Sequence, residues 1–201
     1  IKPVAHYTMG GIEVDFDSMT NVKGLFAVGE CANHKVHGAN RLGGNSLLEL
    51  IVFGKKAGES AALFAKEQNM ADDSFELSTD MGTTNTNIEI DFYKIREELG
   101  DLFYKDVGIV REKSVLQKTL TQVETYISQI PLMGVQDTSQ IYNTNKIEFL
   151  EFVNMLELSR LILIGAIERS ESRGAHYRSD NPQRDDAYNK NVILDKDGVV
   201  G

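Results

Sequence analysis

The sequence is poor in the residues that mark several classes of protein. Among its 201 residues there is one cysteine, Cys31, and no tryptophan. A single cysteine excludes an internal disulfide framework. Lysine and arginine number 21 against 30 aspartates and glutamates, which gives a formal charge of −9. This deficit of positive charge argues against a general nucleic-acid-binding surface, because phosphate binding needs clustered lysine and arginine.

Long apolar runs are also missing. The longest candidate, Leu161–Ile167, is far shorter than the roughly 20 residues of a membrane-spanning helix. Hydrophobic residues nevertheless make up 41% of the chain and charged residues 25%, which is typical of globular proteins. Because the sequence begins at Ile1 rather than at methionine, we expect it to be a piece of a longer chain.

Composition predicts two domains, residues 1–75 and residues 87–201, joined by the polar run Ala71–Thr86. In the first, a glycine pair inside His6–Val14 predicts a hairpin. The apolar run Leu25–Gly29 predicts a buried strand of a parallel sheet.

A long helix is predicted over Leu47–Lys66, with Asn45 or Ser46 as its N-cap. Its apolar residues cover so much of the helix surface that we expect it to be buried.

The second domain contains three stretches in which apolar residues recur every three or four positions, as on one face of a helix. The third stretch, Phe149–Ile167, is apolar nearly all round and suits a central helix. Three such helices with short connections predict an antiparallel bundle. The fold class is therefore α+β: part of an α/β domain (hairpin, strand and long helix), followed by a three-helix antiparallel bundle. The first two stretches contain Ile95, Leu99, Leu102 and Phe103, and then Leu116, Leu120, Val123, Ile127 and Ile130 before a stop at Pro131.

Two segments of the first domain suit ligand binding. Glu30 follows the predicted strand, and a carboxylate at that sheet edge can accept hydrogen bonds from sugar or ribitol hydroxyls. Arg41 precedes two glycines and the long helix, where free backbone N–H groups and the helix dipole favour an anion. Its guanidinium matches a carboxylate in bidentate fashion. The alternatives are a solvated loop acid and an ordinary capped helix.

Histidines and charged residues offer further candidates. His6 can bind a carboxylate or be purely structural. Cys31, His34 and His37 are spaced three residues apart and could bind zinc, although no fourth ligand is evident nearby. The polar segment Arg169–Asn191 suits an ordered surface loop or a tail. The charged cluster within it, Ser172–Arg178 with Arg184–Asp186, suits an exposed salt-bridged loop, a docking surface or a lid.

Four of these segments occur together and in one order. They are His6–Gly11 (HYTMGG), Gly24–Glu30 (GLFAVGE), His37–Leu47 (HGANRLGGNSL) and Ser172–Arg178 (SRGAHYR). In this combination the chain resembles the flavoprotein subunit of succinate dehydrogenase and fumarate reductase. The run RSDNPQRDD over residues 178–186 favours this branch over the related aspartate oxidases.

The resemblance implies FAD as the cofactor and assigns residues to it. Glu30 would contact the ribitol or ribose, and Tyr7 would also touch the cofactor. Asn45, Ser46 and Leu47 would meet the flavin ring at the start of the long helix, whose positive end suits the negative charge of reduced flavin.

The resemblance also implies a dicarboxylate substrate, succinate or fumarate, held by His6 and Arg41. In the family a hydride moves between the flavin and the substrate, and an arginine of another domain transfers the proton. That domain and the Gly-x-Gly-x-x-Gly motif for the FAD pyrophosphate are not in this sequence. The resemblance is therefore to a C-terminal fragment, without the catalytic proton donor, that we expect to be inactive alone and not to retain FAD.

Partners follow from the same resemblance. An iron–sulfur subunit and a membrane anchor bind the flavoprotein subunit in the family, which implies membrane association through partners, at the cytoplasmic face or in an exported form. A strand without its neighbours predicts self-association of the isolated chain. The alternative function is a non-catalytic helical docking module.

Overall fold

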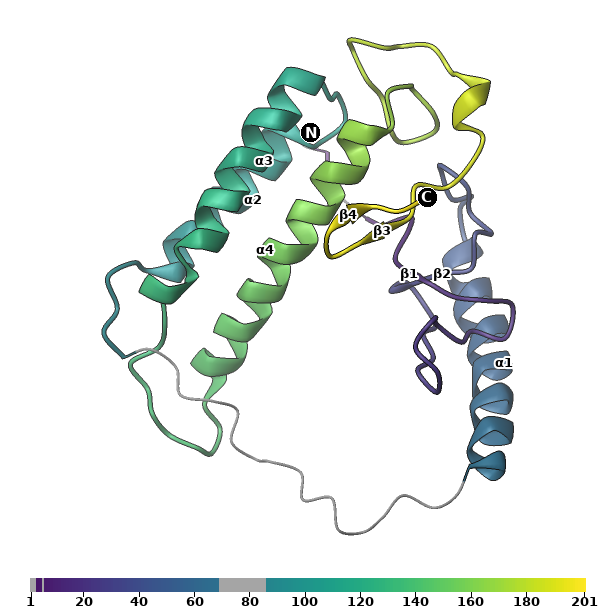
Figure 1. The fold of residues 1–201 in the computed structure, drawn as a ribbon, viewed down its shortest axis with the longest axis horizontal. Helices are drawn as coiled ribbons and strands as arrows, with labels where there is room; N and C mark the ends of the chain where they lie inside the picture. The colour runs from purple at the N-terminus through teal and green to yellow at the C-terminus, as the bar shows by residue number, and fades with distance from the viewer. Residues whose placement is uncertain (1–2, 5, 69–85) are drawn as a thin grey trace. The chain divides into compact units, whose positions relative to one another are not determined.

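The computed structural model describes residues 3–4, 6–68 and 86–201 of the chain. The chain divides into two compact units, Ile1–Leu77 and Ser78–Gly201 (Figure 1). The predicted linker Ala71–Thr86 lies outside the described residues except for Thr86.

Parallel rather than antiparallel pairing organises the start of the first unit. Strand β1 (Ile12–Glu13) pairs with β2 (Ala32–Asn33), which lies 20 residues further along the chain. The predicted hairpin within His6–Val14 is therefore wrong. Gly11 has a φ of 130°, and a Cβ atom there would lie 2.4 Å from the carbonyl oxygen of Cys31. This glycine thus permits the close approach of two segments rather than a tight turn.

The segment Leu25–Gly29 is not a strand of a parallel sheet. Its one ladder contact is an isolated antiparallel bridge between Phe26 and Met19. Ala27 is buried, but Leu25 and Val28 are 52% and 36% exposed. A buried strand of a parallel sheet needs a parallel neighbour and cover on both faces, and the described residues supply neither.

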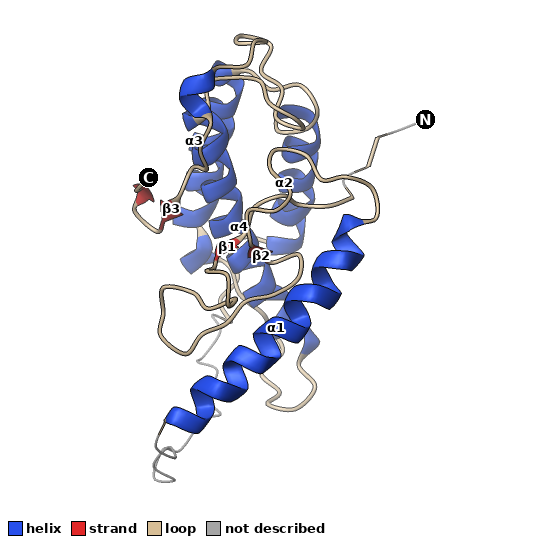
Figure 2. Cartoon of the chain, turned by 90° about the vertical axis from the view of Figure 1, so that its right-hand side faces the viewer, coloured by secondary structure: helices blue, strands red, loops and turns tan. Residues whose placement is uncertain are grey.

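Helix α1 (Asn45–Glu67) confirms the long helix predicted over Leu47–Lys66 (Figure 2). Its N-cap is Gly44, with a φ of 82°, and no side chain caps the helix. The predicted capping role of Asn45 or Ser46 is wrong, because both residues already lie inside the first turn. Glycine adopts the left-handed conformation of residue 44 without strain.

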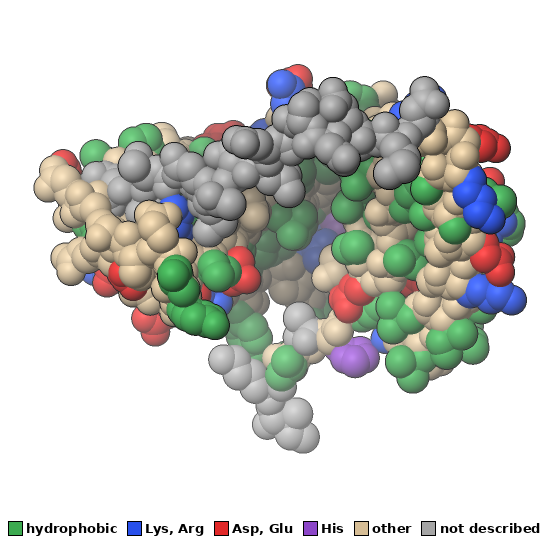
Figure 3. All heavy atoms as spheres, turned by 90° about the horizontal axis from the view of Figure 1, so that it is seen from below, with side chains coloured by type: hydrophobic (Ala, Val, Ile, Leu, Met, Phe, Trp, Pro, Cys, Tyr) green, Lys and Arg blue, Asp and Glu red, His purple; other side chains and the backbone are tan. Residues whose placement is uncertain are grey.

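The expected burial of α1 is also wrong for the described residues. The buried residues of the helix are Glu49, Phe53 and Ala57, which recur every four positions and form one narrow stripe. The buried apolar cluster of this unit contains just three small residues, too few to cover a helix of this length. At the right of Figure 3, on the side of α1, hydrophobic side chains lie at the surface among charged ones. The cluster is Val14, Ala27 and Ala32, and the large exposed apolar residues of α1 are Leu47, Leu48, Leu50, Ile51, Val52 and Leu63.

Three helices build the second unit: α2 (Phe92–Asp106), α3 (Lys113–Ser128) and α4 (Thr144–Glu168). Successive helices run in opposite directions (Figure 1), which confirms the predicted three-helix antiparallel bundle. The predicted stop at Pro131 falls in a short 3-10 helix, η1 (Ile130–Leu132).

Side-chain caps start two of these helices. The Asp91 side chain accepts a hydrogen bond from the backbone N–H of Tyr93 at 3.0 Å. The Asn143 side chain accepts one from the N–H of Lys146 at 2.8 Å. Such caps satisfy N–H groups that have no partner inside the helix.

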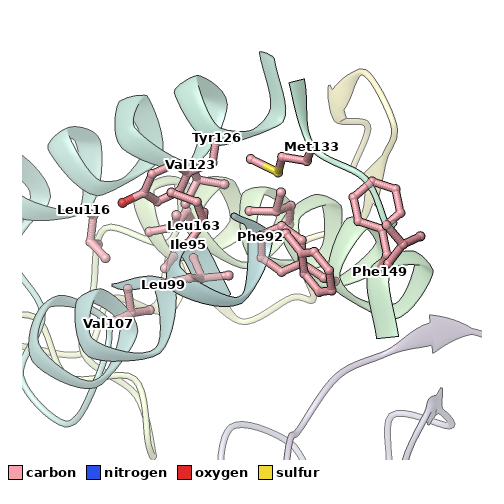
Figure 4. Packing of buried hydrophobic residues seen from close by; sticks show 14 residues of the cluster. Phe92, Ile95, Leu99, Val107, Leu116, Val123, Tyr126, Met133, Phe149 and Leu163 are labelled. Atoms are coloured by element: carbon pink, nitrogen blue, oxygen red, sulfur yellow. The ribbon is translucent and has the colours of Figure 1, made fainter. Parts of the chain in front are cut away.

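One apolar core joins the three helices (Figure 4). Phe152, Leu156 and Leu163 of α4 are fully buried in it. The opposite side of α4 is open, with Leu158 58% exposed. The expectation of a central helix therefore holds for one side of α4 within this unit. The core residues are Phe92, Ile95, Leu99, Val107, Leu116, Val123, Tyr126, Met133, Val135, Phe149, Phe152, Leu156, Leu163 and Ala166.

The chain ends in a 3-10 turn, η2 (Asp186–Tyr188), and a small antiparallel pair, β3 (Leu194–Asp195) and β4 (Gly198–Val199). This pair packs on α4, and Arg160 donates a hydrogen bond to the carbonyl oxygen of Lys196. In the part of the chain that the structure describes, every helix is too short or too polar to cross a membrane.

Candidate functional site

Arg41 lies in the loop before α1, and its side chain is held by local contacts. The guanidinium carbon is 4.5 Å from the centre of the Tyr7 ring, a distance typical of a cation–π contact. Nη1 donates a hydrogen bond to the carbonyl oxygen of Leu42 at 3.0 Å. Nε is buried and has no hydrogen-bond partner among the described residues. A buried N–H without a partner is costly, so this atom favours an acceptor supplied by a ligand.

A buried carboxylate stands behind Tyr7. The Glu49 side chain is only 2% exposed, and its Oε2 accepts a hydrogen bond from the Tyr7 hydroxyl at 2.7 Å. The same oxygen lies 2.6 Å from Nε2 of His37. Burial by itself would raise the pKa of Glu49, but the hydrogen bonds from Tyr7 and His37 outweigh it and hold the pKa below its ordinary value. Burial and then the hydrogen bond to Glu49 raise the pKa of Tyr7 to about 12.

His34 completes this group of side chains. Its Nδ1 lies 3.5 Å from Oε1 of Glu49, and its Nε2 lies 2.9 Å from the hydroxyl of Ser18. The ring stacks on Phe53 with centres 3.8 Å apart. Two imidazoles and a phenol thus converge on one carboxylate, which we call the Glu49 cluster: Tyr7, His34, His37 and Glu49.

The cysteine is not part of that cluster. Sγ of Cys31 donates a hydrogen bond to the carbonyl oxygen of Val28 at 3.4 Å. Over residues 3–4, 6–68 and 86–201, no three side chains of the ligating types are grouped so that they could hold a metal ion. The zinc alternative for Cys31, His34 and His37 therefore finds no support in the geometry.

The other predicted residues take different positions. The Glu30 side chain is exposed, and its Oε1 accepts a hydrogen bond from the backbone N–H of Thr8 at 2.9 Å. Glu30 thus ties the segment that carries Tyr7 to the loop after residue 29. His6 is exposed and does not belong to the Glu49 cluster.

The start of α1 is open to an anion. Helix α1 has no acidic residue in its first turn and no side-chain cap. A Cβ atom built on Gly43 or Gly44 would have nothing within 4 Å. Asn45 and Ser46 are half-buried, and Leu47 is 65% exposed. The positive end of the helix dipole is therefore accessible beside Arg41.

A shallow pocket of about 190 Å³ adjoins the Glu49 cluster. Its polar lining comes from His37, Asn45 and Glu49, and its apolar lining from Val36, Leu48, Val52 and Phe53.

The charged segment of the second unit contains a buried network, while its remaining part is an exposed loop in which Arg184 and Asp186 form the kind of exposed ion pair that the sequence predicts. Glu171 and Arg178 have no exposed surface. Glu171 accepts hydrogen bonds from Arg169 Nη1 at 2.7 Å and from Arg173 Nε at 2.6 Å. Burial opposes ionisation of Glu171, but these bonds lower its pKa to about 2. Arg178 also donates to the carbonyl oxygen of Ala166, so it binds the end of α4. The network thus has a structural role in this unit.

Comparisons with known proteins bear on both units. Residues 96–198, slightly more than half of the chain, match the family described as fumarate reductase flavoprotein C-term. The chain belongs to this fumarate reductase flavoprotein family. Residues 1–47 also match the family of FAD binding domains, so the match includes the Tyr7–Arg41 segment and the start of α1.

Individual relatives agree. The chain is 41% identical to the fumarate reductase flavoprotein subunit of Haemophilus influenzae, over 96% of this chain and 34% of that protein. It is 37% identical to the succinate dehydrogenase flavoprotein subunit of Bacillus subtilis, over 92% of this chain and 33% of that protein. The chain spans about a third of the length of these relatives.

Solved structures are similar as well. A mutant of E. coli quinol fumarate reductase superposes with a TM-score of 0.86 at 36% identity, over 96% of this chain and 35% of that chain. A quinol-fumarate reductase with menaquinol molecules gives a TM-score of 0.83 at 37% identity, over 97% and 36%. The predicted family and α+β fold class are thereby confirmed.

Sequence reasoning missed Glu49. A signal was present, because this carboxylate stands between Leu48 and Leu50 in a helix whose neighbouring positions are apolar. A charged residue on such a helix is buried only when it is paired. Its partners Tyr7 and His37 lie 42 and 12 residues away in the chain. The pattern around Glu49 therefore could not identify them.

Proposed function

We propose that this chain forms part of the substrate and flavin site of an FAD-dependent subunit that interconverts succinate and fumarate. The observation that carries the proposal is the position of Arg41. Its guanidinium is held on Tyr7, and its buried Nε–H, which has no partner in the described part of the chain, lies beside the open start of α1. The family of this chain, and the names of its relatives, supply the reaction class.

Arg41 would bind one carboxylate of the dicarboxylate. Its planar guanidinium suits a carboxylate in bidentate geometry, and the cation also polarises the substrate. His6 would donate a hydrogen bond to the same substrate. Its exposure in this unit leaves its ring nitrogens accessible.

The residues at the start of α1 fit FAD. The uncapped helix end, the open space at Gly43 and Gly44 and the match of residues 1–47 to FAD binding domains support a flavin there. Ser46 and the backbone of Leu47 would meet the ring, with Asn45 beside them. When bound, FAD would accept or deliver the hydride of the reaction.

Two other residues would contact the same cofactor. Glu30 would accept hydrogen bonds from its ribitol or ribose hydroxyls, and Tyr7 would lie against it. The bond from the Thr8 N–H to Glu30 keeps these two residues close in the fold.

We further propose that the chain functions as part of a larger assembly with other protein segments and subunits. The six large apolar residues exposed on α1 are more than a stable isolated unit leaves uncovered, and the chain spans a third of its relatives' length. Two of the similar structures are quinol fumarate reductases. Electrons would therefore pass through an iron–sulfur subunit, with the complex held at the membrane by an anchor subunit, at the cytoplasmic face or in an exported form. Alone, the chain would be inactive.

The test is a chimera in which this chain replaces the matching third of the Haemophilus influenzae subunit. Turnover between succinate and fumarate is expected, with loss of turnover in the Arg41→Ala chimera. As a control, Lys55→Ala changes a cation on the exposed side of α1, 79% exposed, and should leave turnover unchanged. A chimera that folds and retains FAD but does not act on either dicarboxylate would contradict the proposal.

A further inference from the structure

Among the described residues of the first unit, Glu49 is the most deeply buried acid, and no role assigned above accounts for it. Its carboxylate is 2% exposed. Its contacts come from three positions in the two loops that precede α1, namely Tyr7, His34 and His37. Hydrogen bonds from Tyr7 and His37 to Oε2 offset the cost of burying this charge, while Oε1 has a longer contact, 3.5 Å, with Nδ1 of His34.

We infer that Glu49 is a positioning residue, which holds Tyr7 and His37 in single orientations and thereby fixes the guanidinium of Arg41 on the Tyr7 ring. That Arg41 then meets a dicarboxylate rests on the function proposed above. The positioning itself depends only on contacts within this unit.

The first step runs from Glu49 to Arg41 through Tyr7. The phenol donates its proton to Oε2 of Glu49 at 2.7 Å, and this bond sets the direction of the ring. A phenol that donates to a carboxylate has a more electron-rich ring, which attracts a cation on its face more strongly. The Arg41 guanidinium occupies that face at 4.5 Å. The negative charge of Glu49 thus acts on the cation of Arg41 through the ring between them.

The second step is the bracing of Tyr7 by His37. Because an ionised carboxylate only accepts hydrogen bonds, the contact at 2.6 Å assigns the proton of His37 to Nε2. The imidazole then stands edge-on to the Tyr7 ring, with centres 5.7 Å apart and planes at 89°. Tyr7 is therefore held by its hydroxyl and braced by an aromatic edge as well as by Arg41.

The third step is the anchoring of Glu49 itself. The residue lies on α1, one turn from Phe53, whose ring stacks on His34. The carboxylate is thus mounted on a rigid element, whereas its partners lie on loops. Sites are more precise when rigid elements orient the loop residues that contact the ligand.

Glu49→Leu in the full chain tests the inference, because leucine keeps the bulk and the helix but accepts no hydrogen bond. Two signals are measured by NMR: the ring-current shift of the Arg41 δ protons and the ¹⁵N pattern that reports the His37 tautomer. We expect the Arg41 shift to be largely lost and His37 to become a mixture of tautomers. Glu49→Gln, whose amide oxygen can replace Oε2, should restore part of both. The matched control is Glu59→Gln on the same helix, where the side chain is 66% exposed, and both signals should stay as in the unchanged chain.

Unchanged Arg41 and His37 signals in Glu49→Leu would overturn the inference. If that variant does not fold, Tyr7→Phe replaces it, because it keeps the ring and removes the hydroxyl. An Arg41 shift that persists in a folded Tyr7→Phe chain would likewise overturn it.

The chimera described above supplies the functional readout. There Glu49→Gln is expected to raise the KM for succinate about tenfold with a smaller change in kcat. The reason is that the substitution weakens the hydrogen bonds that orient Tyr7 and Arg41, and Arg41 binds the substrate. A chimera without any turnover would count against the proposed function, while the NMR signals would still decide the role of Glu49.

Discussion

The buried carboxylate of Glu171 offers the sharpest test of how the second unit is held together. It accepts hydrogen bonds from Arg169, from Arg173 and from the backbone N–H of Asp185 at 2.7 Å. Replacing it in Glu171→Gln keeps the shape but removes the charge. The new amide group would also place N–H donors against the donors of both arginines.

Two estimates of the loss agree. The pKa of Glu171 falls from 4.5 to about 2 on folding, which corresponds to about 3 kcal/mol of stability at neutral pH. Removing one partner of a buried ion pair destabilises by about 3–5 kcal/mol. We therefore expect Glu171→Gln to lower the free energy of unfolding of the second unit by about 3 kcal/mol.

Urea unfolding followed by helical circular dichroism measures this difference. Because the folded-state pKa lies below the ordinary value, the stabilisation is complete above pH 4.5 and is lost as the pH falls towards about 2. By about pH 3, roughly 2 kcal/mol of the difference between the two chains should have disappeared. The control is Glu168→Gln, three residues earlier and exposed, which should change stability by less than about 0.5 kcal/mol.

A loss below about 1 kcal/mol at neutral pH would refute the account of Glu171 as a saturated buried anion. A difference that stays constant from about pH 6 to about pH 3 would also refute it, since the charge would then not be the cause.

Four further predictions follow from the two units. Leu156→Ala should lower the free energy of unfolding of the bundle by about 3 kcal/mol, because Leu156 is fully buried. Leu158→Ala, on the exposed side, should change that free energy by less than about 0.5 kcal/mol. Equal losses in urea unfolding would contradict the packing described. Deletion of residues 1–80 should leave the helices at 87–169 folded, as judged by circular dichroism, because the described core of this unit consists of residues between 92 and 166; a chain without a cooperative transition would argue otherwise. The isolated chain should retain no yellow flavin band after mixing with FAD and gel filtration, and should not turn over succinate; a retained band would show that residues 6–47 hold FAD without a pyrophosphate loop. Light scattering should detect association of the isolated chain through the apolar surface of α1, and a strict monomer would contradict this.

The local sequence alone was enough to predict the helices of this protein. The bundle helices and α1 follow from apolar residues at three- and four-residue spacing, and the stop at Pro131 follows from the missing N–H of proline. These features depend on neighbours within a few residues, so no knowledge of the tertiary fold was needed. The four ordered motifs likewise sufficed to predict the family, and the match of residues 96–198 to the family model confirmed it.

The tertiary structure decided what depends on partners distant in the chain. Gly11 looked like a turn residue, yet it serves the approach of β1 to the carbonyl of Cys31. Leu25–Gly29 has the composition of a buried strand, but pairing requires neighbours that its own residues do not specify. Glu171 and Arg178 looked like surface charges, and are buried because their partners saturate them.

The candidate site shows the same division. Some of its residues were legible in the sequence, namely an arginine before glycines at the start of a helix and the motif residues Tyr7 and Glu30, but Glu49 was not. Their geometry was not, because the contact of Arg41 with Tyr7 and of Tyr7 with Glu49 joins positions separated by 34 and 42 residues. Local sequence determined the helices and the kind of chemistry available. Folding alone determined which side chains meet, since the energy of a buried charge is set by its spatial neighbours rather than by its neighbours in the chain.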